Sequence, residues 1–64
     1  MEEARRIREE HADWSFIQRQ PQPLKAALLY YIKTGDLYVA SRIAGLTLDE
    51  MNKLRIKAGI PNVA

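Results

Sequence analysis

The residues most able to do chemistry lie between positions 42 and 57, and their types suit contact with double-stranded DNA. The amide of Asn52 can pair with adenine through two hydrogen bonds, and the hydroxyl of Thr47 can contact a base or a phosphate. Basic side chains nearby can bind phosphates and add a salt-dependent attraction. The predicted DNA-binding residues are therefore Arg42, Thr47, Asn52, Lys53, Arg55 and Lys57.

Two acidic residues, Asp49 and Glu50, lie in the same segment and oppose its approach to phosphate. Their charges have a structural explanation, because carboxylates stabilise the N-terminal turn of a helix. A structural explanation also exists for the basic residues Lys53, Arg55 and Lys57, since a solvated helix flank often carries such charges. The sequence leaves DNA binding and a purely structural role both open.

A helix-turn-helix over residues 37–59 would position this site. Gly45 supplies the turn, because glycine adopts positive φ at no steric cost. Thr47 and Glu50 have the spacing of a capping box, and Leu46 and Met51 that of a hydrophobic staple, so a helix should start at this point. Ser41 is small at the place where the two helices must cross closely.

The sequence predicts an all-α fold for the whole chain, namely a compact four-helix domain that contains this helix-turn-helix. We expect one domain over residues 1–64, with an N-terminal amphipathic helix at 2–19 and a helix-turn-helix core at 23–60. The prolines at 21 and 23 separate these parts, and Gly35 and Gly59 end later helices. Asp36 should cap the helix that follows Gly35.

Helical spacing predicts which side chains pack inside. The first helix has a seam at Ala4, Ile7, His11 and Trp14, and the second an apolar face at Leu24, Ala27, Leu28, Tyr31 and Ile32. Packing in the core is therefore the prediction for Trp14 and Tyr31. Leu29 and Tyr30 lie off that face, and we expect either the first helix or a second protein to cover them.

Composition argues against several classes of function. The chain has no cysteine and one histidine, so neither a metal site nor a cofactor is expected, and no catalytic motif appears. Residues 1–10 are charged throughout, which excludes a secretory signal there, and no apolar run is long enough for a membrane span. We expect a cytoplasmic protein that is not an enzyme. The net charge of +2 permits an anionic partner without requiring one.

Residues 28–63 resemble small prokaryotic antitoxin-like proteins of the VapB type, many of them archaeal. The resemblance lies in the Leu-Tyr end of a helix, Gly35 with Val39-Ala40, the turn at 44–46, the helix start at 48–51 and the closing Gly59-Ile60-Pro61. It implies that the helix-turn-helix binds operator DNA and that a tail after Pro61 binds a nuclease toxin. Three residues follow Pro61, so we expect this chain to lack such a tail.

The sequence therefore supports two alternative hypotheses from different functional classes. One is a DNA-binding regulator or antitoxin-like protein, acting as a homodimer because a single helix-turn-helix buries too little surface for tight specific binding. The other is a helical protein-interaction module without nucleic-acid binding, which binds a toxin or another protein through Leu29 and Tyr30.

Overall fold

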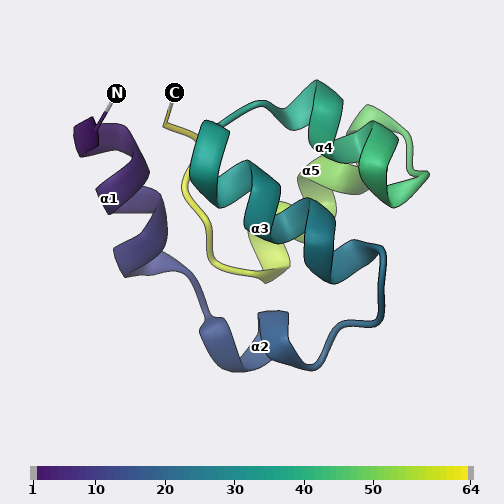
Figure 1. The fold of residues 1–64 in the computed structure, drawn as a ribbon, viewed down its shortest axis with the longest axis horizontal. Coiled ribbons are helices and arrows are strands. Elements are labelled where there is room, and N and C mark those ends of the chain that lie inside the picture. Colours follow the sequence, from purple (N-terminus) through teal and green to yellow (C-terminus); the bar gives the residue numbers. More distant parts are fainter. Residues whose placement is uncertain (1, 64) are drawn as a thin grey trace.

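Prolines, glycines and capping residues divide the chain into five helices in the computed structural model, which describes residues 2–63 (Figure 1). The helices are α1 (Glu2–His11), α2 (Trp14–Gln18), α3 (Leu24–Thr34), α4 (Leu37–Ala44) and α5 (Leu48–Lys57). No strand occurs within the described range. The all-α class is confirmed, and the expected number of four helices is wrong.

The extra helix arises because the segment predicted as one helix, 2–19, breaks at Asp13. This residue is extended (φ −86°, ψ 91°), and its carboxylate caps α2 by accepting a hydrogen bond from the Phe16 amide. Its own amide donates to the carbonyl of Ala58 at 2.8 Å. A tertiary hydrogen bond and a local cap thus replace the continuous helix.

The break also changes which side chains of the N-terminal segment face the core. Trp14 is 41% exposed and His11 is exposed, so the prediction that Trp14 packs in the core is wrong. The indole of Trp14 instead donates to the carbonyl of Glu9 at 3.0 Å. Within residues 3–11 of α1 the buried side chain is Arg8, at 2% exposure, while Ile17 is the fully buried residue of α2.

The core is built around α3, whose apolar face is as predicted. Ala27, Leu28, Tyr31 and Ile32 are buried and Leu24 is half-buried. The rest of the cluster consists of Ile17 from α2, Ala40 and Ala44 from α4, Met51 from α5, and Ala58 and Ile60 from the closing segment. Leu29 is 39% exposed and Tyr30 is half-buried against the core.

Candidate nucleic-acid interface

The segment from α4 to α5 is set by local signals in the sequence. Asp36 caps α4 through the Val39 amide (3.0 Å), and Gly45 ends α4 with φ 72°. Thr47 then caps α5: its hydroxyl accepts from the Glu50 amide at 3.1 Å, and its amide donates to the Glu50 carboxylate at 2.9 Å. The predicted capping box is therefore confirmed.

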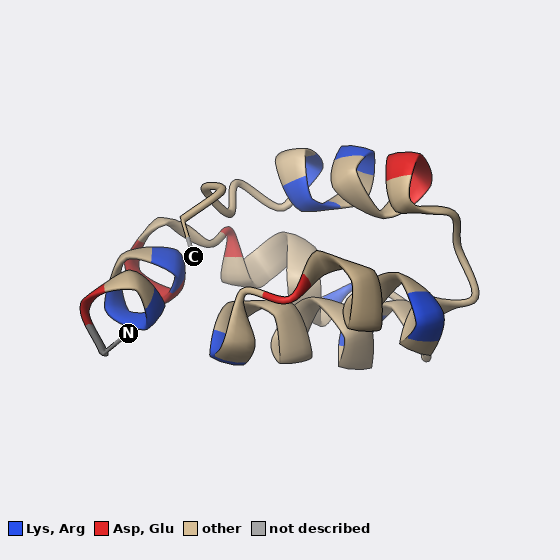
Figure 2. Ribbon diagram, turned by 90° about the horizontal axis from the view of Figure 1, so that it is seen from above, with Lys and Arg blue, Asp and Glu red and all other residues tan. Residues whose placement is uncertain are grey.

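Small buried residues allow α4 to contact its neighbours closely. Ala40 and Ser41 are almost fully buried and Ala44 is 9% exposed, and α4 packs against both α3 and α5. In Figure 2, α5 lies on one side of the layer formed by α3 and α4, which leaves its outer side open. Leu48 and Ile56 are 48% and 58% exposed on that helix.

The six predicted DNA-binding residues separate into two groups. Arg42, Thr47, Lys53 and Lys57 are exposed, so their side chains are accessible to a partner. Lys53 forms an exposed ion pair with Asp49 at 3.2 Å, which contributes little to stability. A phosphate can therefore compete for Lys53 at low cost.

The other two residues, Asn52 and Arg55, bind each other. The guanidinium of Arg55 donates to the Asn52 side-chain oxygen at 3.0 and 2.6 Å and to the carbonyl of Ile60 at 2.8 Å. Arg55 is only 9% exposed. Arg55 therefore does not lie on a solvated helix flank, and its contact with phosphate stays a prediction. The oxygen that Asn52 would offer to adenine is already occupied by Arg55.

The charge of the protein is distributed unevenly between interior and exterior. Arg8 and Arg55 are buried, and within residues 2–63 both donate to carbonyl or amide oxygens. The eight other basic residues equal the eight acidic residues in number. The net charge of +2 therefore equals the charge of the two buried arginines, and attraction of an anion to the surface depends on local groups of exposed cations.

Local charge on α5 follows the helix direction. Its first turn carries Asp49 and Glu50, and its last turn carries Lys57 together with the buried Arg55. Figure 2 shows acidic residues at one end of this helix and basic residues along the rest. This order stabilises the helix dipole, and it places the exposed cations Lys53 and Lys57 beyond the first turn.

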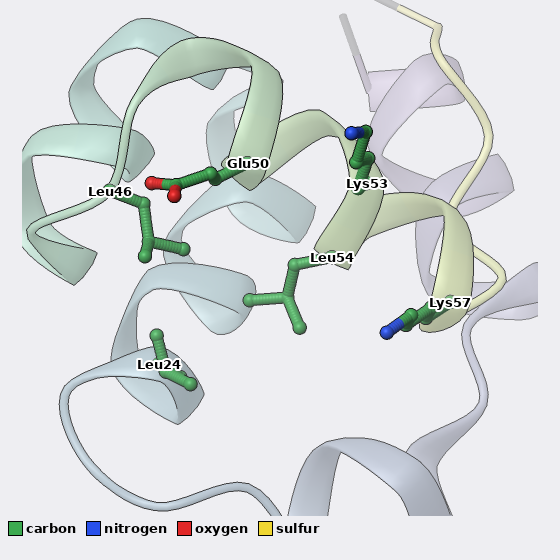
Figure 3. A pocket seen from close by; sticks show the side chains of 6 residues that line it. All are labelled: Leu24, Leu46, Glu50, Lys53, Leu54 and Lys57. Atoms are coloured by element: carbon green, nitrogen blue, oxygen red, sulfur yellow. The ribbon is translucent and has the colours of Figure 1, made fainter.

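A shallow pocket of about 250 Å³ lies between the start of α3 and one side of α5. Figure 3 shows the side chains of Leu24, Leu46 and Leu54 converging on it, with Glu50 and two lysines at its edge. The sequence analysis did not predict this pocket, because its leucines come from three separate segments. It offers an apolar surface to a ligand or a protein.

The described residues also bear on metal binding and on membrane insertion. Among the described residues, no group of three or more His, Asp or Glu side chains is placed to hold a metal ion. Nor does any of the described helices have the length and apolar character needed to cross a membrane. Comparisons with protein-family models, with curated proteins and with solved structures give no match to this chain.

Proposed function

We propose that this chain is a small DNA-binding protein of the helix-turn-helix type, with an antitoxin-like or regulatory role, in which α5 is the recognition helix. The observation that carries the proposal is the α4–Gly45–α5 unit, whose exposed side chains include Arg42, Lys53 and Lys57. In this class of protein the second helix enters the major groove while the first crosses the phosphate backbone.

The exposed residues suit these two roles. Thr47 lies at the N-terminus of α5, which is the part of a recognition helix that contacts base edges. Leu48 and Ile56 are exposed apolar side chains of the kind that contact the methyl group of thymine. Lys53, Lys57 and Arg42 supply the phosphate contacts, so the predicted site is smaller than the sequence implied.

Dimerisation belongs to the same proposal. Single DNA-binding modules bury only about 600–1,000 Å² of protein surface, and specific sites usually need two of them. A homodimer would present two copies of α5 to two half-sites.

An NMR titration with a short DNA duplex tests the proposal at residue level. At low salt, amide shifts should concentrate between Thr47 and Lys57 and around Arg42, and they should weaken as salt is added. Shifts that are absent at low salt, or that fall only on α1 and α2, would contradict it.

A protein-interaction module is the second candidate, and the pocket of Leu24, Leu46 and Leu54 favours it. Exposed Leu29 adds an apolar position on α3. A protein partner held by apolar contacts should survive high salt and be lost on Leu24→Asp or Leu29→Asp. A partner that dissociates at moderate salt, or that tolerates both substitutions, would count against this function.

A further inference from the structure

Tyr38 and Arg42 form an exposed pair on α4 to which the sequence assigned no joint role. They are one helical turn apart, and Arg42 Nη1 donates a hydrogen bond to the Tyr38 hydroxyl at 2.8 Å. The guanidinium carbon lies 5.8 Å from the centre of the tyrosine ring. Tyr38 is 55% exposed, so the pair lies at the surface and not in the core.

The hydrogen bond determines what the pair can offer to a ligand. An arginine has five N–H donors and no acceptor, and one of these donors is used by Tyr38. Because the phenol oxygen accepts from Arg42, the phenol O–H is left to donate outward. Within residues 2–63 the guanidinium makes no other hydrogen bond and no ion pair. The pair therefore presents donors alone, which matches an anionic oxygen.

The contact also holds the arginine in place. A free arginine side chain loses rotamer entropy when it binds a phosphate, and the tyrosine contact has already restricted that freedom. Planar guanidinium groups bind phosphate oxygens through two parallel hydrogen bonds when they are correctly oriented.

We propose that Tyr38 and Arg42 together form a phosphate-binding element on α4, in which Tyr38 orients the guanidinium and donates its own hydroxyl to the DNA backbone. This inference rests on the proposed DNA-binding function, in which the first helix of the motif crosses the backbone. It adds Tyr38 to the site as a positioning and phosphate-contacting residue.

The test measures binding of a fluorescently labelled random-sequence duplex by the full chain and by Tyr38→Phe. The substitution keeps the ring and removes the hydroxyl, so affinity should fall about threefold to tenfold, the effect of one lost hydrogen bond. Its salt slope should stay that of wild type because Arg42 keeps its charge, whereas Arg42→Gln should flatten the slope by about one unit. In the Arg42→Gln background, Tyr38→Phe should cost less than it does alone.

Ser15→Ala is the matched control, because it removes a hydroxyl that accepts a hydrogen bond from an exposed arginine, Arg19, at α2 and should leave affinity unchanged. Circular dichroism should show that both variants stay helical. If Tyr38→Phe binds like wild type while Lys53→Ala weakens binding, the inference fails and the proposed function stands. If wild type binds no duplex even at low salt, both are overturned.

Discussion

Replacing Arg8 by methionine should destabilise the fold more than any other single exchange of a charged residue in α1. Arg8 donates to the carbonyls of Ile32 (2.8 Å) and Val63, and it thereby joins α1 to the end of α3 and to the closing segment. A third contact, to the carbonyl of Lys33 at 3.5 Å, is too long to add much. Positive charge at the C-terminus of α3 is also favourable for the helix dipole.

The size of the effect follows from these contacts. Hydrogen bonds from a charged donor contribute about 1.5–3 kcal/mol each, so losing two should cost about 3–6 kcal/mol. A domain of this length has a total free energy of unfolding of about 3–10 kcal/mol. Methionine keeps an apolar stem in place of the arginine stem, so most of the loss should come from the two carbonyls left without a donor.

Urea denaturation followed by circular dichroism measures this loss. The matched control is Arg6→Met, which removes the same charge from an exposed position on α1 and should change stability by less than about 0.5 kcal/mol. In a thermal scan, Arg8→Met should lower Tm by at least about 12 °C, at about 4–8 °C for each kcal/mol in a domain of this size. Equal stability of the two variants would refute the assignment of Arg8 as a buried connection.

Five substitutions separate structural from binding roles. Arg55→Met should lower the urea midpoint, whereas Lys53→Ala should leave it unchanged. Lys53→Ala alone should flatten the salt dependence of duplex binding, and the reverse pattern would show that Arg55 contacts phosphate. Asp49→Asn should raise duplex affinity several-fold by removing the carboxylate 3.2 Å from Lys53, and weaker binding would argue against α5 as the DNA-facing helix. Thr47→Ala should cost about 1 kcal/mol in urea denaturation through loss of the cap, and an unchanged midpoint would show that the capping box is dispensable. Gly45→Ala should cost about 1–2 kcal/mol because of its positive φ alone, since the added carbon would have no atom within 4 Å beyond its neighbours along the chain; a stabilised variant would contradict that strain.

Local signals made the α4–α5 segment predictable. A capping box, an N-cap aspartate and a glycine with positive φ each act within a few residues, so their geometry follows from residue type and spacing. The structure contains all three, at Thr47 with Glu50, at Asp36 and at Gly45. The apolar face of α3 was predictable for a related reason, because five residues at helical spacing leave little choice of orientation.

The remaining features depend on contacts between distant segments. Asp13 is a good N-cap in sequence, but the break there is reinforced by a hydrogen bond to Ala58, which helical periodicity cannot anticipate. Sequence alone does not reveal that Arg8 and Arg55 are buried, because arginine is seldom buried. Their burial depends on carbonyl acceptors that the fold brings close, including Val63, which lies 55 residues from Arg8 along the chain.

The salt dependence of duplex binding, measured by fluorescence anisotropy, tests most directly whether the α4–α5 unit binds DNA through its exposed cations. If Arg42, Lys53 and Lys57 each neutralise one phosphate, the logarithm of the association constant should fall with the logarithm of salt with a slope of about −2.7 for each copy bound. Replacing all three by glutamine should bring the slope close to zero, while Arg6→Gln, a matched change on α1, should leave it unaltered. A slope near zero for the wild-type protein, or one that the triple substitution leaves unchanged, would contradict the account.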